Sequence, residues 1–421
     1  MSQRISSGVA TLLFAGIAIC TALSIVSERI LPLALIGSGV CFAGLVASIR
    51  RWLPPLTILI GIGGLLVMLL VSVSVTPDRA TTLPQVQRVG IGILLFGAIS
   101  AWATTRLRLV GLLGAILMSG SALALLTLIL VLNRANASLT ALPVPVLNDT
   151  VNANVLAGQL VLIIPIALAL LIYLRRGVPL WMALFGGCVS TLLISAVLLS
   201  NSRGALLALV GATGTVLIGR VHPALTLLGI GGASGIVLST PFLNMLPELL
   251  SQLPRDLQER AEIWQRGWWL LRGAPLTGIG MGTFQAAVDR LYPYLLINPP
   301  YTIPHAHHLL LQIGIDIGVA GLAAWLLLYS SSVARGMQLA AWGRRHHGWA
   351  QAVGLGVLGS MSALLLHGAL DAVTWGVVRP APLVWAIWGL GLAGWYHRGM
   401  FAEACETQPV IPRSATISED E

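Results

Sequence analysis

The stretch HAHHLLLQIGIDIGVAGLAAW, residues 305–325, places three histidines at the start of a long apolar run. A run of roughly 17 to 25 apolar residues can cross the hydrocarbon core of a membrane as a helix. We therefore expect a spanning helix over residues 307–333, with the histidines at its mouth. Similar runs recur along the chain, and only 9% of its residues are charged, against about 25% in soluble domains. The sequence predicts an all-α integral membrane protein.

Length and hydropathy predict about twelve transmembrane helices. The connections between them are short except for residues 244–306, which we expect to form one large extracytoplasmic loop that contains short helices. The expected helices cover residues 8–26, 30–49, 54–75, 89–105, 109–132, 153–174, 178–199, 204–219, 223–243, 307–333, 350–372 and 380–397.

The arginines predict the orientation of these helices. Five connections that would lie on one side carry basic residues and no acidic residue, and basic loops face the cytoplasm. This pattern predicts a multi-pass protein of the cytoplasmic (inner) membrane, with both termini in the cytoplasm and residues 244–306 outside. No soluble basic domain is present to bind nucleic acid, so we expect no nucleic-acid partner.

The chain divides into three expected regions. Residues 1–150 hold the first five helices, and residues 151–400 hold the region that carries polar candidates for a site. Residues 401–421 form a polar, acidic tail, for which we expect disorder and a cytoplasmic position.

Two arginines in the long loop are candidates for binding an anion. Arg260 and Arg266 fall in a segment that predicts a helix over residues 256–272, lying along the membrane interface with its tryptophans inserted. The alternative is that both arginines pair with Glu259 or Glu262 on the same helix.

Arg203 lies in a short outer turn between two apolar runs. Asn201 and Ser202 can cap the helix that follows, and the amides at a helix N-terminus favour an anion. A guanidinium at this position suits phosphate, to which arginine donates two parallel hydrogen bonds. The alternative is an arginine at the membrane boundary that extends its side chain into water.

The three histidines allow proton transfer, metal binding or helix capping. A neutral imidazole titrates near pH 6.5 and suits His307 for accepting a proton, with His305 and His308 beside the substrate. A zinc site needs about four ligands, and no further ligands stand at useful spacing, so we expect no metal.

Three more polar residues fall in apolar surroundings, where such groups usually face the protein interior and have partners. Asp316 stands within the helix that the histidines open, and His367 and Asp371 are four residues apart in a later one. We expect supporting, orienting roles for all three. No Walker motif, DxD pair, HExxH or GxSxG motif is present, and GIGMGTF at residues 278–284 predicts a tight turn. We therefore expect no cofactor.

Taken in order, several motifs resemble the O-antigen ligase and O-antigen polymerase family of membrane glycosyltransferases, known as the Wzy-type C-terminal family. The resemblance covers about residues 150–375. It rests on NANVLAG at 152–158, SRGA at 202–205, R-x-x-x-W at 260–264, PLTGIGMGTF at 275–284 and HAHHLLLQIGIDIGVAGL at 305–322.

The resemblance implies a metal-independent C-type glycosyltransferase that takes a glycan from undecaprenyl pyrophosphate at the outer face of the cytoplasmic membrane. The acceptor would be a lipid-A core, a protein or another lipid-linked repeat. Arg203 and Arg260 match the family's pyrophosphate-binding arginines, and His307 matches the histidine near the acceptor. The family commonly has Asn where this chain has His308, so which of the three histidines acts stays open. The alternative is a polytopic transporter or flippase for a lipid-linked or anionic solute.

Overall fold

The computed structural model describes residues 2–49, 52–135, 153–173, 180–221, 255–295, 303–375 and 382–401. Every regular element within these ranges is a helix. The helices are α1 (Ser2–Val26), η1 (Glu28–Ile30), α2 (Leu31–Ile49), α3 (Leu56–Val75), α4 (Arg79–Trp102), α5 (Arg106–Ala135), α6 (Ala153–Tyr173), α7 (Leu180–Leu199), α8 (Arg203–Val221), α11 (Arg255–Gly273), α12 (Phe284–Leu291), α13 (Leu309–His346), α14 (Gly348–Gly368), α15 (Pro382–Tyr396) and η5 (Arg398–Phe401).

Eight helical segments in the described ranges are long and apolar enough to cross a membrane, which agrees with the predicted all-α membrane protein. Two further apolar segments, Ala183–Leu199 and Arg203–Gly219, are shorter. The structure does not confirm the expected number of about twelve. The expected helix 223–243, residues 244–254 and 296–302 of the expected loop, and the tail from residue 402 lie outside the described residues.

Two expected helices have different bounds in the structure. The helix expected at 89–105 begins instead at Arg79, because Asp78 caps it and accepts hydrogen bonds from the amide and the hydroxyl of Thr81, at 3.2 and 2.6 Å. Hydropathy did not detect this start because its first turns are polar. The helix expected at 307–333 is α13, which continues to His346.

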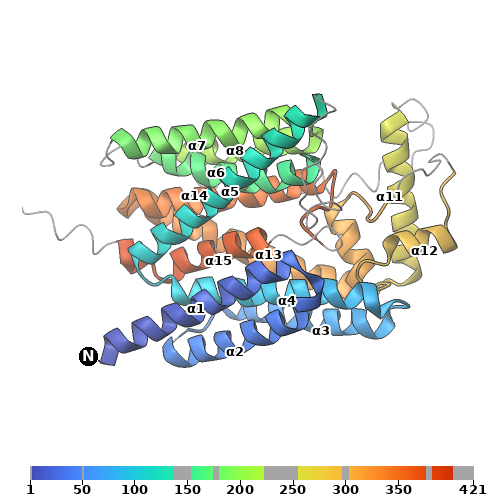
Figure 1. Cartoon of the computed structure of the whole chain (residues 1–421), viewed down its shortest axis with the longest axis horizontal. Coiled ribbons are helices and arrows are strands. Elements are labelled where there is room, and N and C mark those ends of the chain that lie inside the picture. The colour runs from blue at the N-terminus through green and yellow to red at the C-terminus, as the bar shows by residue number, and fades with distance from the viewer. Residues whose placement is uncertain are drawn as a thin grey trace, which may run out of the picture.

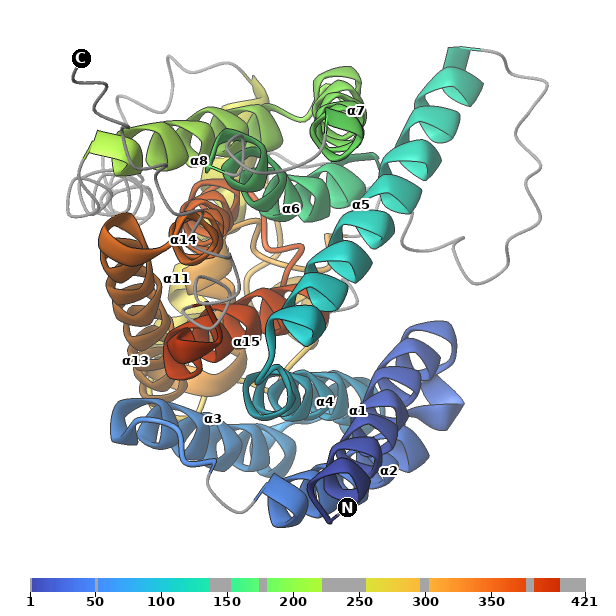
Figure 2. The same ribbon diagram turned by 90° about the vertical axis from the view of Figure 1, so that its left-hand side faces the viewer.

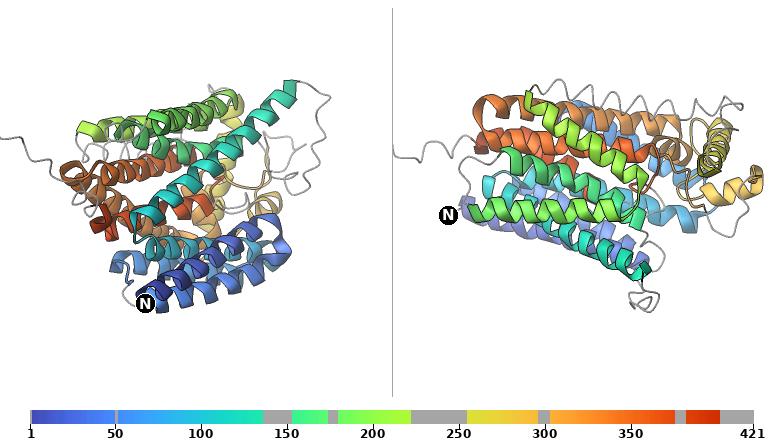
Figure 3. Two further views of the ribbon diagram at one scale, coloured as in Figure 1. Left: turned by 60° about the vertical axis from the view of Figure 1, so that its left-hand side comes forward. Right: turned by 90° about the horizontal axis from the view of Figure 1, so that it is seen from above.

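Most of the helices run alongside one another (Figure 1). The start of α1 lies at one end of the molecule, and α11 and α12 lie at the other end. Helices far apart in the sequence pack together: α3 against α13, α4 against α15, and both α6 and α8 against α14. Figures 2 and 3 show the same arrangement from other sides, with α14 close to α6 and α8.

Glycines allow α14 to pack closely against its neighbours. A Cβ atom on Gly356 would lie 2.9 Å from the Cα of Ile166 in α6, and one on Gly354 would lie 2.6 Å from the backbone nitrogen of Ala340 in α13. Small residues at such contacts favour helix association in a membrane, where apolar side chains gain little by leaving lipid. This close packing fixes the C-terminal end of α14, where the candidate site lies.

Helix α13 is broken near its start. Ile317 is not helical, and Gly318 has φ 72° and ψ 173°. The loop between α11 and α12 fills the break: the amide of Ile279 donates to the carbonyl of Ile315 at 2.8 Å, and the amide of Val319 donates to that of Pro275 at 2.7 Å. The glycine-rich segment is therefore a tight turn that approaches another backbone, as predicted.

The close approach explains the glycines of this loop. Gly278 has φ 69°, and a Cβ there would lie 2.6 Å from the carbonyl carbon of Asp316. The loop is also tied to the end of α3 and the start of α4, because the amide of Met281 donates to Ser72 Oγ at 3.0 Å and Thr82 Oγ1 donates to the Met281 carbonyl at 2.9 Å. Helix α11, which matches the helix expected at 256–272, is thereby held against the start of α13.

Candidate active site

The segment 305–308 precedes α13 and is not helical. His308 is the N-cap of α13, and its Nδ1 accepts a hydrogen bond from the amide of Leu311 at 3.2 Å. His307 has φ 48°, a left-handed conformation that is uncommon for a residue other than glycine. Its carbonyl accepts a hydrogen bond from Trp264 Nε1 of α11 at 3.3 Å, which helps to hold this backbone.

His305 and His307 face the carboxylate of Asp371, which follows α14. His307 Nδ1 lies 3.3 Å from Asp371 Oδ1, and His305 Nε2 lies 3.6 Å from the same oxygen. The two imidazole rings are 4.3 Å apart between centroids. Asp371 and His305 are buried, whereas 27% of the His307 side chain is exposed. The exposed ring can therefore reach a substrate while its partners stay fixed.

Hydrogen bonds define where the protons lie in this cluster. The amide of His307 donates to His305 Nδ1 at 3.2 Å, so in neutral His305 the proton is on Nε2 and faces Asp371. Burial is the main reason that the pKa of His305 falls to about 4, and the nearby His307 adds to this effect. His305 is therefore neutral at pH 7.

Asp371 is the anion of the cluster. Burial by itself raises its pKa, but the hydrogen bond with His307 and the nearby imidazoles outweigh burial and hold the pKa of Asp371 below its ordinary range. The amide of Ala372 also donates to Asp371 Oδ1 at 2.8 Å. An ionised Asp371 favours the His307 tautomer with the proton on Nδ1, and this leaves the lone pair of Nε2 available. No partner for that Nε2 is found among the described residues.

Arg260 approaches the same region from α11. One of its terminal nitrogens, Nη1, donates to the carbonyl of Leu370, the residue before Asp371. The side chain is partly exposed. Arg260 therefore presents its guanidinium next to the histidine cluster, and the carbonyl positions the charge without neutralising it.

Arg203 is exposed at the first position of α8. Ser202 caps this helix, and its Oγ accepts from the amide of Ala205 at 3.3 Å. A Cβ on Gly204 would lie 3.5 Å from the Cβ of Leu370, whose carbonyl binds Arg260. The start of α8 and the side chain of Arg260 thus meet at Leu370, although they are more than fifty residues apart in the sequence.

His367 is fully enclosed between helices. A Cβ on Gly158 of α6 would lie 2.6 Å from its Cε1, and one on Gly204 of α8 would lie 3.5 Å from its Cδ2. Its Nε2 is buried without a hydrogen-bond partner in the described part of the chain. The two glycines allow α6 and α8 to approach the imidazole, which occupies the space between the start of α8 and the cluster.

Asp316 lies outside the histidine cluster and supports the site through hydrogen bonds. The side chain is buried; it accepts from Gln312 Nε2 at 2.8 Å and from Trp375 Nε1 at 3.0 Å. Gln312 Oε1 in turn accepts from the amide of Ala306 at 2.7 Å. Asp316 therefore fixes both sides of the site, through Gln312 the histidine segment and through Trp375 the segment after Asp371.

The structure gives other partners to two of the predicted substrate-binding residues. Arg266 forms a buried ion pair with Glu262 at 2.9 Å and stacks over Trp269 at 4.6 Å. His308 caps α13 and is 1% exposed. Neither Arg266 nor His308 lies in the His305–His307–Asp371 cluster.

The cluster also has the composition of a possible metal site. His305, His307 and Asp371 each offer one ligand atom, and these atoms lie within 4.8 Å of one another; no other such group occurs among the described residues. The nitrogens that face Asp371 Oδ1, and that a cation there would use, are His305 Nε2 and His307 Nδ1; in the hydrogen-bonded arrangement described above both of these nitrogens carry a proton. The cluster can thus be a hydrogen-bonded proton-transfer site or a metal site, and a chelation experiment distinguishes the two.

The comparison with known families agrees with this geometry. Residues 188–326 match the family model described as O-antigen ligase. This match supports a relationship to the O-antigen ligase and polymerase family over the matched residues. A search of curated proteins found no match to the chain.

The O-antigen ligase match includes Arg203, Arg260 and His307, but it ends before α14. Asp371 and His367 lie beyond it and join the site because α14 packs back against α13 and α6. Sequence reasoning missed Gln312, Trp375 and the carbonyl of Leu370. Gln312 could have been found, because it stands four residues before Asp316 on the same helical face.

Proposed function

We propose that the chain transfers a glycan from an undecaprenyl-pyrophosphate donor to an acceptor hydroxyl or amide in surface polysaccharide assembly. The acceptor belongs to a lipid-A core, a protein or another lipid-linked repeat. The observation that carries the proposal is the contact between His307 and the buried Asp371, next to the meeting point of Arg260 and the start of α8.

His307 acts as the general base in this proposal. Its Nδ1 proton points to Asp371, so the lone pair of Nε2 accepts the proton of the acceptor hydroxyl. The acceptor oxygen then forms a bond to the anomeric carbon of the donor glycan, and the bond from that carbon to the pyrophosphate oxygen breaks. Asp371 stabilises the imidazolium that forms.

The arginines stabilise the leaving group. The electron pair of the broken bond stays on undecaprenyl pyrophosphate, whose negative charge grows during the reaction. Arg260, Arg203 and the N-terminal amides of α8 are positioned for such an anion. Because the donor is already activated, the reaction needs neither a nucleotide nor a resident metal.

The proposed location is the outer face of the cytoplasmic membrane, with both termini in the cytoplasm. Two basic residues in the first turn of α5 support this orientation, because they lie at the end of the molecule where α1 begins. Arg108 donates to Ser7 Oγ at 2.7 Å, and Arg106 lies over the ring of Trp349 at 5.1 Å. The site and α11 lie at the opposite end (Figure 1).

A transporter or flippase for a lipid-linked or anionic solute is the second candidate. A transporter is expected to carry polar groups within the membrane in both halves of the chain. The N-terminal half has a buried arginine, Arg88 of α4, but this arginine is paired with Glu28 at 2.6 Å. A flippase also has no need for the contact between Asp371 and an exposed His307.

The test is to incubate purified protein with a synthetic undecaprenyl-pyrophosphate glycan and candidate acceptors, followed by mass analysis. Growth of the lipid-linked chain identifies a polymerase, and a new conjugate with a different lipid or a protein identifies a ligase. Movement of the intact donor across a vesicle membrane, with no covalent product, would overturn the proposal in favour of the flippase.

A further inference from the structure

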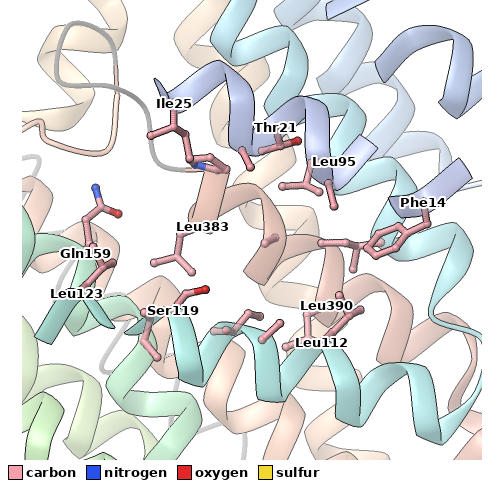
Figure 4. A pocket seen from close by; sticks show the side chains of 18 of the residues that line it. Phe14, Thr21, Ile25, Leu95, Leu112, Ser119, Leu123, Gln159, Leu383 and Leu390 are labelled. Carbon is pink, nitrogen blue, oxygen red and sulfur yellow. The ribbon is translucent and has the colours of Figure 1, made fainter. Parts of the chain in front are cut away.

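An apolar crevice of about 510 Å³ lies between α1, α4, α5, α6 and α15 (Figure 4). A cavity of about 150 Å³ lined by Leu, Ile and Phe side chains holds one benzene ring. The crevice therefore has room for a much longer hydrocarbon. Its walls belong to apolar helices, so a hydrocarbon is the chemistry that fits it.

The crevice extends along the helices rather than across them. Ile25, near the last residue of α1, and Leu383, near the first residue of α15, lie toward one end, and Phe14 lies toward the other (Figure 4). On α5 it extends from Leu112 to Leu123, which is about 16 Å at about 1.5 Å per residue. This length equals about half of a hydrocarbon core that is about 30 Å thick.

The crevice is open to the surrounding lipid. Ala115 and Ser119 of α5 line it and are nevertheless exposed. Figure 2 shows α5 diverging from α1 along its length. A lipid chain can therefore enter sideways from the membrane, and it does not have to thread through the protein.

Besides the hydroxyls of Thr21 and Ser119, the lining of the crevice includes one polar side chain, the amide of Gln159. Gln159 of α6 is buried, and its Oε1 has no hydrogen-bond partner among the described residues. Rotation of the amide exchanges its oxygen and nitrogen, so the same position can donate a hydrogen bond. Gln159 lies about 9 Å from the start of α6 at Ala153. An amide at this depth suits the phosphate end of a lipid better than its tail.

The crevice and His367, which lies next to the histidine cluster, share one turn of α6. Gln159 lines the crevice, and its neighbour Gly158 contacts His367, which also touches Gly204 at the start of α8. A lipid whose chain occupied the crevice would thus have its head at the end of the molecule that carries Arg203. A crevice for bulk lipid could lie anywhere on the membrane-facing surface, whereas a crevice for a lipid-linked donor has to lie near the residues that bind its pyrophosphate.

We propose that this crevice binds the polyprenyl chain of the donor, with the pyrophosphate directed past Gln159 toward the arginines. The inference rests on the proposed function, because it assigns a second contact to the same substrate. It makes a distinct claim, namely that the residues lining the crevice, which lie outside the histidine cluster, select for the length of the lipid chain.

The test is a substitution that fills the crevice, Ser119→Trp, with Met118→Trp as its matched control. Met118 is the preceding residue of α5, is 59% exposed and does not line the crevice. Two donors are compared that carry the same glycan pyrophosphate on undecaprenyl or on a short prenyl chain. Ser119→Trp is expected to raise KM about tenfold or more for the undecaprenyl donor, the loss for roughly two methylene groups no longer buried. It should leave the short donor unchanged, and Met118→Trp should change neither.

A cross-linking measurement decides the case independently of turnover. An undecaprenyl pyrophosphate with a diazirine in its chain should label peptides of α5 and α15 in the wild type and in Met118→Trp, and should lose this labelling in Ser119→Trp. Labelling elsewhere, equal KM changes for both donors, or a KM change for a lipid acceptor instead would overturn the inference. If the wild type transferred glycan from neither donor, the proposed function would fail, and the labelling would still test the crevice.

Discussion

The apolar crevice and His367 lie beside the same turn of α6, and the amide of Asp371 in the histidine cluster donates to the carbonyl of His367. The cluster and the crevice nevertheless differ in almost every physical property. The cluster packs His305, His307 and Asp371 around a single carboxylate oxygen. The crevice contains no charged side chain and one buried amide, that of Gln159. We propose that the first region handles protons and anions and that the second binds hydrocarbon.

The difference indicates a division of labour over one amphiphilic substrate. Substitutions in the cluster should impair transfer from every donor, whatever the length of its lipid chain. Substitutions in the crevice should impair only donors that carry the long chain. Each prediction about the cluster therefore gains in precision when it is measured with both donors.

The largest effect is expected for Asp371→Asn. The amide cannot stabilise the imidazolium of His307 and favours the wrong tautomer, and the loss in kcat should be on the order of 10²–10⁴-fold. Rates from purified protein with the long and the short donor should fall by the same factor. Retention of most of the wild-type kcat would show that the contact with His307 is structural.

The next largest effect is expected for substitutions of Arg203 and Arg260. Arg266, which lies on α11 like Arg260, serves as the control. Replacing Arg203 or Arg260 by Ala should reduce kcat/KM about 10²–10³-fold, the cost typical of losing one donor to a developing negative charge. Arg203→Lys should also be poor, because an ammonium does not reproduce the two-pronged contact with phosphate.

Arg266→Ala should behave differently. It leaves the buried carboxylate of Glu262 without its arginine, which typically destabilises a protein by about 3–5 kcal/mol. Thermal melting in detergent should show this loss, while kcat/KM of the remaining folded protein stays near that of the wild type. A selective loss of donor affinity in Arg266→Ala would place this arginine in the binding site after all.

The sequence points to individual candidate residues more readily than to their contacts. Arg203, Arg260 and His307 stand out because they match motifs of the O-antigen ligase and polymerase family. The contact between His307 and Asp371 joins residues 64 positions apart and depends on how α14 packs against α13. Asp371 was accordingly assigned only a supporting role.

The fold shows the same limit. Hydropathy located the long apolar helices, but it did not find the start of α4, where Asp78 caps a polar turn. It could not find the break at Gly318, because the loop residues that fill it come from another part of the chain. The crevice was invisible for a further reason: its lining consists of ordinary apolar residues whose only distinction is the space between them.

A smaller effect is expected from pH through His305. Its pKa is about 4 in the folded protein and 6.5 ordinarily, so the unfolded chain binds this proton first as the pH falls. The contribution of a neutral His305 to stability is therefore complete above pH 6.5 and is lost toward pH 4, by roughly 3 kcal/mol at most. Melting temperatures at several pH values should fall less steeply in His305→Asn. Parallel curves for the two proteins would contradict the assignment of a neutral, buried His305.

No effect is expected from chelation. In the proposed reaction the arginines neutralise the pyrophosphate and His307 accepts the proton, so no metal takes part and purified protein treated with EDTA should keep its full rate. Loss of transfer with EDTA and its recovery with a divalent ion would mean that His305, His307 and Asp371 are ligands of a metal.

The most direct test of the central claim is to measure donor binding and turnover together in His307→Ala. The claim is that His307 moves a proton while the arginines hold the donor. The variant should bind undecaprenyl-pyrophosphate glycan with nearly the wild-type Kd, and its kcat should fall about 10²–10⁴-fold, the usual contribution of a general base. Full turnover in His307→Ala, or a loss of donor binding that accounts for the whole defect, would contradict the account.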